Sequence, residues 1–145
     1  MDVRSLCRHR AVTIGASADL VEAARLMREA HVGFLIVVEG GGPIGVITDR
    51  DLVLETVAAD VPPHDVTVGD AMSAEPVTIA ETSAIEEALE SMRLAGVRRL
   101  PVVDDGGRVT GVLSIDDVLE HLAGQLGSVA GSLRHEQAAE RLARP

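Results

Sequence analysis

The chain has 145 residues, of which 46% are hydrophobic and 1% aromatic, and its formal net charge is -10. This length and apolar content allow one compact domain with an aliphatic core and exclude global disorder. The negative charge argues against non-specific binding to nucleic acid or to an anionic membrane. Cys7 is the single cysteine, which excludes an intramolecular disulfide and a thiolate metal cluster. No apolar stretch approaches the ~18 residues of a membrane span, and the N-terminus lacks the apolar core of a signal peptide. A cytoplasmic location is therefore expected.

The first half of the chain is predicted to fold in the order β-α-β-β-α. A short lead-in, a strand, a helix, two strands and a second helix are expected at 3–10, 12–14, 20–31, 34–38, 44–48 and 50–59, respectively. The first helix is predicted because Leu20, Ala23, Ala24 and Met27 recur at i, i+3, i+4 and i+7 on one face. The run 34–38 is uniformly apolar, which indicates a central strand.

The same order returns in the second half. Val12-Thr-Ile14 recurs as Val77-Thr-Ile79 at a shift of 65 residues, and one extra residue in a later turn makes the shift 66. A repeat of this length indicates two duplicated units, 3–59 and 68–122, and neither is expected to bury its apolar faces alone. The linker 60–67 contains a Pro-Pro pair that ends the preceding helix. Ser83-Ala-Ile-Glu86 has the spacing of a capping box.

The remaining residues, 123–145, are predicted to form a helical tail. Apolar residues spaced 3, 4, 3 and 4 apart lead into it, namely Leu119, Leu122, Leu126, Val129 and Leu133. This spacing is typical of a coiled-coil seam, although Gly124, Gly127 and Gly131 lower the helix propensity. Two interpretations stay open: the tail covers apolar surface of its own chain, or it forms a dimer contact.

One seven-residue motif closes each unit, as Gly45-Val-Ile-Thr-Asp-Arg-Asp51 and Gly111-Val-Leu-Ser-Ile-Asp-Asp117. Thr48 and Ser114 lie where a strand leads into a helix and are N-cap candidates. Asp51 and Asp117 fall in the first helical turn, where negative charge suits the helix dipole. A single carboxylate in this place is commonly structural. Its repetition in register favours a binding role.

Together these features resemble a tandem pair of CBS (cystathionine β-synthase) domains, often called a Bateman module. The resemblance rests on the two β-α-β-β-α units, the repeated motif, and Val97-Arg-Arg-Leu-Pro-Val-Val-Asp104, and it covers about residues 3–122. It implies an α/β fold with the two repeats packed around a pseudo-twofold axis, clefts between them, and frequent homodimers. It also implies an adenine nucleotide or other adenosyl ligand, no required cofactor, and an allosteric role without chemistry of its own.

The resemblance assigns ligand-binding roles to the first strands, the motif corners and an arginine pair. These residues are Thr13, Ile14, Thr48, Asp51, Thr78, Ile79, Arg98, Arg99, Ser114 and Asp117. A carboxylate can accept hydrogen bonds from both ribose hydroxyls. The N-terminus of a helix favours a bound phosphate, and the planar guanidinium group of arginine matches the geometry of phosphate oxygens. Gly33-Phe34 replace the arginine pair in the first unit, so the two clefts are expected to be unequal. Which cleft the arginines serve stays open.

The favoured function is a regulatory sensor. It would bind AMP, ADP, ATP or an S-adenosylmethionine-like ligand and modulate an unidentified protein partner in trans. The alternative is a ligand-free oligomerisation or scaffold module, suggested by the arginines missing from the first unit. No nucleophile–base arrangement supports an enzyme, and the five scattered histidines lack metal-ligand spacing, so neither catalysis nor a bound metal is expected. The expected partners are a small molecule and a second copy of the chain, with no nucleic acid and no membrane.

Overall fold

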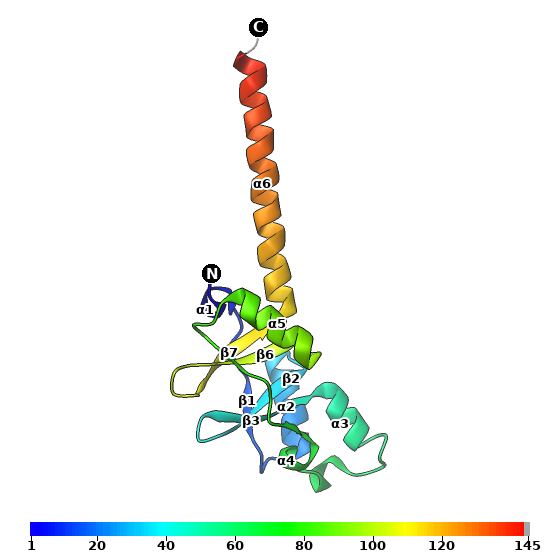
Figure 1. Ribbon diagram of the computed structural model, residues 1–145. Coiled ribbons are helices and arrows are strands. Elements are labelled where there is room, and N and C mark those ends of the chain that lie inside the picture. The colour runs from blue at the N-terminus through cyan, green and yellow to red at the C-terminus, as the bar shows by residue number, and fades with distance from the viewer. Residues whose placement is uncertain (144–145) are drawn as a thin grey trace.

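The computed structural model describes residues 1–143 and consists of two α/β units from which one long helix projects (Figure 1). The strands are β1 (Thr13–Gly15), β2 (Phe34–Glu39), β3 (Gly42–Thr48), β4 (Ser73–Ala74), β5 (Ile79–Ala80), β6 (Arg99–Val103) and β7 (Val109–Ser114). The helices are α1 (Val3–Leu6), α2 (Leu20–Ala30), α3 (Asp49–Glu55), α4 (Val68–Ala71), α5 (Ile85–Ala95) and α6 (Ile115–Ala143), with a short 3-10 helix η1 (Pro63–Asp65). The predicted order β-α-β-β-α is confirmed in both units.

Each unit contains its own sheet with the same local topology. The first sheet has the strand order β1-β2-β3-β4, and the second has the order β5-β6-β7. In each, the short first strand runs parallel to the central strand, which pairs antiparallel with the strand that ends at the motif. The middle residues of the central strands β2 and β6 are buried, as the apolar runs in these strands predict.

One predicted helix end and one predicted helix cap differ from the structure. The helix expected to reach Ala59 ends at Glu55, and the hydroxyl of Thr56, its C-cap residue, donates to the Leu52 carbonyl. The capping box predicted at Ser83 is wrong, because α5 begins one residue later, with Ala84 as its N-cap and no side-chain cap. The backbone of Ser83 is used elsewhere: its carbonyl accepts the Val3 N–H at 2.9 Å.

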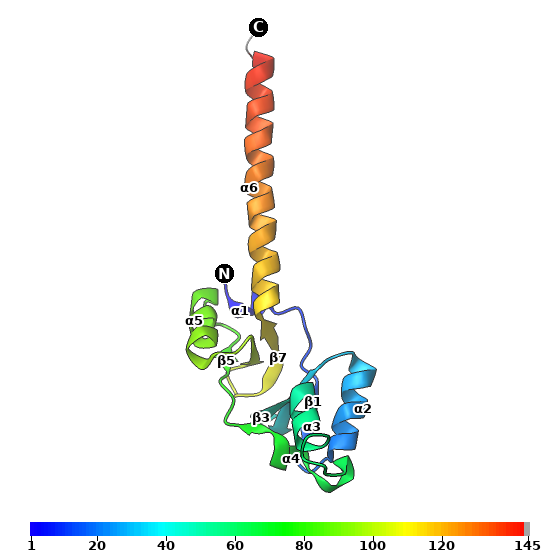
Figure 2. The same cartoon turned by 90° about the vertical axis from the view of Figure 1, so that its right-hand side faces the viewer.

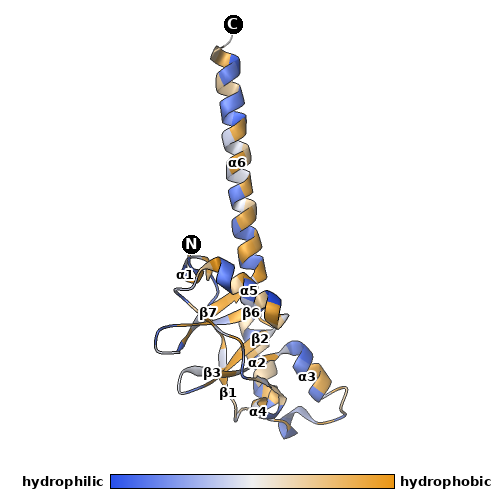
Figure 3. Ribbon diagram, viewed as in Figure 1, coloured by the Kyte–Doolittle hydropathy of each residue, from blue (hydrophilic) through white to orange (hydrophobic). Residues whose placement is uncertain are grey.

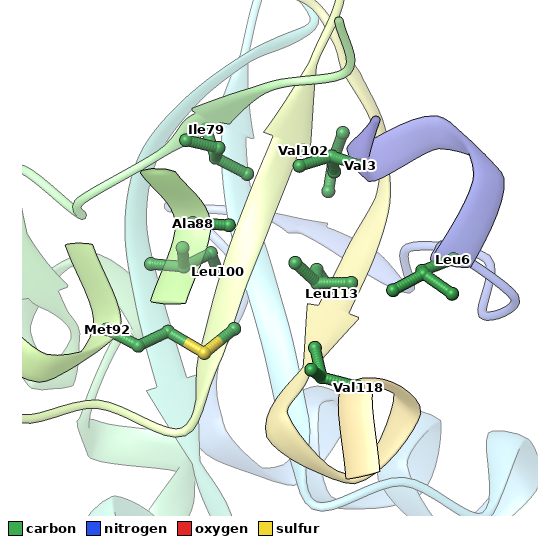
Figure 4. Close-up of a cluster of buried hydrophobic side chains, with 9 residues drawn as sticks. All are labelled: Val3, Leu6, Ile79, Ala88, Met92, Leu100, Val102, Leu113 and Val118. Atoms are coloured by element: carbon green, nitrogen blue, oxygen red, sulfur yellow. The ribbon is translucent and has the colours of Figure 1, made fainter. Parts of the chain in front are cut away.

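The two units exchange their lead-in segments. Val3 and Leu6 of α1 are buried in the core of the second unit, together with Ile79, Ala88, Met92, Leu100, Val102, Leu113 and Val118 (Figure 4). Conversely, Val68 of α4 is buried in the core of the first unit, beside Leu20, Ala23, Met27, Leu35, Val37 and Ile47. Neither unit therefore buries its apolar faces alone, as the duplication predicts.

The glycine of each motif makes room for the lead-in of the other unit. A Cβ atom at Gly111 would lie 2.5 Å from Cys7 Sγ and 3.2 Å from the His9 carbonyl oxygen. A Cβ at Gly45 would collide with the side chain of Met72, which is the repeat equivalent of Cys7. Cys7 is half-buried, its thiol donates to the Val112 carbonyl at 3.3 Å, and burial raises its pKa. Cys7 therefore packs against β7 as a small, partly buried side chain.

The predicted helical tail is present, but it does not cover its own chain. The final helix of the second unit and the tail form one helix of 29 residues, in which only Asp117 and Val118 are buried. Figures 1 and 2 show it leading away from both units. The interpretation that the tail covers apolar surface of its own body is therefore wrong. Residues 144 and 145 of the predicted tail lie outside the described chain. Among the helices within residues 1–143, none is long and apolar enough to cross a membrane.

Candidate functional site

The motif spacing produces the same hydrogen-bonded corner in both units. In the first, the Thr48 N–H donates to Asp51 Oδ2 at 2.8 Å, and the Asp51 N–H donates to Thr48 Oγ1 at 3.3 Å. In the second, the Ser114 N–H donates to Asp117 Oδ2 at 3.1 Å, and the Asp117 N–H donates to Ser114 Oγ at 3.2 Å. The predicted N-cap roles of Thr48 and Ser114 are confirmed. Each aspartate thus holds its corner with one carboxylate oxygen.

A cavity of about 530 Å³ opens at the Ser114–Asp117 corner, between the two units. The second unit contributes Arg99, Val112, Ser114, Asp116, Asp117 and Glu120, and the N-terminal half contributes His9, Arg10, Val12, Ala30, His31, Val32, Gly33 and Phe34. This volume is that of a small-molecule site. The cavity joins an apolar wall to a buried carboxylate and two arginines, so it can hold a ligand that has both an apolar ring and polar groups.

Asp117 is the buried charge of this cavity. Its side chain is only 4% exposed, and its Oδ1 atom lies 3.1 Å from Nε2 of His9, whose own side chain is 68% exposed. His9 reaches this position because the lead-in runs along β7, where His9 and Val112 form an antiparallel bridge. Oδ1, the carboxylate oxygen that does not hold the corner, therefore contacts the largely exposed side chain of His9.

The first-unit corner differs in its neighbours. β4 runs beside β3 there, and Ala74 occupies the repeat position of His9. Asp51 is more exposed than Asp117, and within residues 1–143 no cationic side chain forms an ion pair with it. The expectation that the two clefts are unequal rested on the arginine pair. The structure adds a second difference, at the carboxylates themselves.

The arginine pair lies near the Asp117 corner. Arg99 lines the cavity, and its guanidinium carbon lies 5.8 Å from the centroid of the Phe34 ring, a cation–π contact. Phe34 is the repeat equivalent of Arg99, so these two positions meet where the two units face one another. Arg98 Nη2 lies 3.8 Å from Oδ1 of Asp116, another cavity residue, and both side chains are largely exposed.

The other predicted site residues are not brought into this cavity. Thr48 and Asp51 form the opposite corner. Thr13 is exposed at the edge of the first sheet, whereas the Ile14 side chain packs against the first core. Ile79 is buried in the second core, and Thr78 beside it is half-buried. The apolar wall near the first strand is supplied by Val12 instead.

Sequence reasoning missed several cavity residues, above all His9 and Arg10. The available signal was the basic run Arg8-His-Arg10 directly before the first strand. It is a weak signal, because such a run is commonly a solvated segment, and only the crossing of the lead-in to the other unit brings it to Asp117. Within residues 1–143, no group of three His, Cys, Asp or Glu side chains is arranged to hold a metal ion.

The CBS domain family matches the chain twice, over residues 3–57 and 68–124. An uncharacterised protein of Methanopyrus kandleri, MK0525, is 36% identical over 121 residues, which are 83% of this chain and 62% of that protein. The chain thus spans less than two thirds of that relative.

Solved structures share the fold. Hypoxic Response Protein I, crystallised with two coordinated zinc ions, has a TM-score of 0.74 at 29% identity, over 83% of this chain and 98% of that one. The CBS domain protein PAE2072 from Pyrobaculum aerophilum, complexed with AMP, has a TM-score of 0.73 at 26% identity, over 86% of this chain and 99% of that one.

Proposed function

The chain belongs to the CBS domain family, and we propose that it is a regulatory module that binds an adenosyl ligand in the cavity at Asp117. The observation that carries this proposal is the convergence of a buried carboxylate, a hydroxyl, two arginines and an apolar wall on one cavity between the units. The complex of the related PAE2072 protein with AMP supports this ligand class.

Each part of an adenosyl ligand would find a matching group. The ribose hydroxyls would donate to Asp117 Oδ1, replacing His9 there. Adenine would pack against Val12, Val32 and Phe34. Phosphate oxygens would accept hydrogen bonds from the guanidinium of Arg99 or Arg10. A phosphorylated ligand such as AMP therefore fits this cavity better than an uncharged adenosyl compound. The Thr48–Asp51 corner would take an uncharged adenosyl group or stay empty.

Regulation would follow from the position of His9 on the lead-in. A ligand that displaces His9 from Asp117 acts on the segment that leads back to α1, which is packed in the core of the second unit. Differential affinity for two arrangements of this segment would shift their populations. A protein partner that contacts only one arrangement would sense the ligand in trans.

Thermal unfolding of the full chain with adenosine, AMP, ADP, ATP and S-adenosylmethionine tests the binding. A ligand with a Kd of ~10 µM, present at ~1 mM, stabilises the native state by about 2.7 kcal/mol. We expect the largest rise in Tm with a phosphorylated ligand.

Paired variants then locate the site. Asp117→Asn should weaken binding at least tenfold by titration calorimetry, because a hydrogen bond to a charged group contributes about 1.5–3 kcal/mol. Asp51→Asn is the matched control and should leave the Kd of a phosphorylated ligand unchanged. Equal affinity of both variants and the unmodified chain would contradict the assignment of Asp117.

The second candidate is a scaffold without a ligand. The first unit has Gly33-Phe34 where the second has Arg98-Arg99. This difference favours the scaffold, since one half of the module lacks the arginine pair. If protein shown to be ligand-free gains no stability from any compound in the panel, the scaffold function replaces the sensor.

A further inference from the structure

The apolar stripe of α6 carries an inference that does not depend on the ligand cavity. Leu119, Leu122, Leu126, Val129 and Leu133, here called the α6 seam, are between 46% and 70% exposed. Their spacing of 3, 4, 3 and 4 residues places them on one face of the helix. Figures 1 and 2 show that no other element of the described chain lies beside most of this helix. Figure 3 shows hydrophobic residues recurring along it.

The helix is too weak to stand alone in water. Gly124, Gly127 and Gly131 each cost about 1 kcal/mol relative to alanine in a helix interior. Single helices gain most of their stability from packing of an apolar face. The glycines do not interrupt the seam, because in a heptad with Leu119 at a they occupy the b and f positions on the opposite side. The seam is therefore the face that packs.

The composition beside the seam favours a second copy of this chain. Residues 122–133 contain no charged side chain, although the chain carries a net charge of -10. The flanking e and g positions in this stretch are Ala123, Gln125, Ala130 and Ser132. Two copies can approach without like-charge repulsion, and no charges are present to select a different helix. Within residues 122–133, the polar side also lacks the basic residues that would hold an amphipathic helix on a membrane surface.

The lengths on either side of the seam select a parallel pair. Its centre, Leu126, lies 11 residues after the start of α6 and 17 residues before Ala143. At about 1.5 Å per residue, an antiparallel pair centred there would push the last turns of each helix, about 9 Å, against the body of the other copy. In a parallel pair in register, both bodies lie at the same end of the coiled coil, so the C-terminal turns meet no body. We propose that the α6 seam is the interface of a parallel two-stranded coiled coil between two copies of this chain.

Cysteine cross-linking of the full-length chain tests this interface. In a Cys7→Ser background, Val129→Cys places two thiols face to face at a d position of a parallel pair, whereas an antiparallel pair centred on Leu126 separates them. Gly124→Cys, on the back of the same helix, is the matched control, and a side chain there meets open space. Mild oxidation with copper–phenanthroline should give a covalent dimer for Val129→Cys and at least tenfold less for Gly124→Cys.

Charge substitutions separate this interface from any contact between the bodies. Leu126→Glu in the Val129→Cys chain should abolish the cross-link and lower the helix signal in circular dichroism, because α6 loses its partner. Gly124→Glu adds the same charge on the opposite face of the helix, and this variant should retain both the cross-link and the helix signal. Equal cross-linking at positions 129 and 124, or a cross-link that survives Leu126→Glu, would overturn the proposal. Leu126 is exposed, so the body of the chain folds in either case.

Discussion

Asp117 and Asp51 have the same sequence position in the repeat but different surroundings. Both use one carboxylate oxygen to accept the N–H of the residue three positions earlier. The second oxygen of Asp117 faces Nε2 of His9, whereas the repeat position of His9 at the other corner is Ala74. A ligand at Asp117 must therefore compete with a side chain, and one at Asp51 need not. This difference, added to that in the arginine pair, makes the two corners chemically distinct.

Replacing His9 tests this competition. His9→Ala should lower the Kd of the adenosyl ligand about fivefold, because the contact between His9 and Asp117, a hydrogen bond that contributes about 1 kcal/mol, no longer has to break. Titration calorimetry measures the change, with Arg8→Ala as the control for loss of a basic lead-in residue outside the cavity. Weaker binding by His9→Ala would instead place His9 among the groups that hold the ligand.

At the scale of elements, the close crossing of lead-in and motif strand explains the motif glycine. β7 passes so near to the segment 7–9 that a Cβ at Gly111 would meet both the Cys7 thiol and the backbone of His9. The thiol can rotate, but the backbone oxygen can move only if the whole segment moves. Since His9 lies on this segment, the geometry of the cavity depends on the absence of a side chain at Gly111.

We therefore expect Gly111→Ala to destabilise the protein by about 1–3 kcal/mol, as overpacking does. Chemical unfolding followed by circular dichroism measures this loss. Gly124→Ala is the matched control: its Cβ meets nothing within 4 Å, so it should retain or raise stability through better helix propensity. A Gly111→Ala chain as stable as the unmodified one would show that the lead-in shifts freely.

At the scale of the whole molecule, the exchanged lead-ins couple the two units. α1 completes the second core, and α4 completes the first, through backbone bonds such as Val3 N–H to the Ser83 carbonyl and Val68 N–H to the Ala18 carbonyl. Unfolding either unit would strip the other of buried aliphatic side chains. The two repeats should therefore unfold as one cooperative body.

Leu6→Ala tests this coupling. Leu6 is 3% exposed in the second core, and its truncation should cost about 2–5 kcal/mol. Because the cores are linked, scanning calorimetry should still show one transition, shifted to lower temperature. Two resolved transitions, of which only one moves, would mean that each repeat is stable without the other.

The repeat order and the corner capping could be predicted from the sequence because they depend on neighbours within a few positions. Helical periodicity, the apolar strand runs and the Thr48–Asp51 and Ser114–Asp117 spacings are local signals, and the structure confirms them. The false capping box at Ser83 shows the limit of such signals. The spacing of residues can match a capping box while the backbone at that position binds a distant segment. Here the carbonyl of Ser83 accepts a hydrogen bond from the Val3 N–H.

The sequence alone thus determined two duplicated β-α-β-β-α units, their capped motif corners and a helical tail with an apolar stripe. Four features became visible only in the fold: the lead-ins cross between units, His9 meets Asp117, Arg99 belongs to the same cavity, and the α6 seam is not covered by its own chain. The physical reason is the range of the forces involved. Capping and periodicity act along a few residues of one element, whereas burial and ion pairing join segments at opposite ends of the chain.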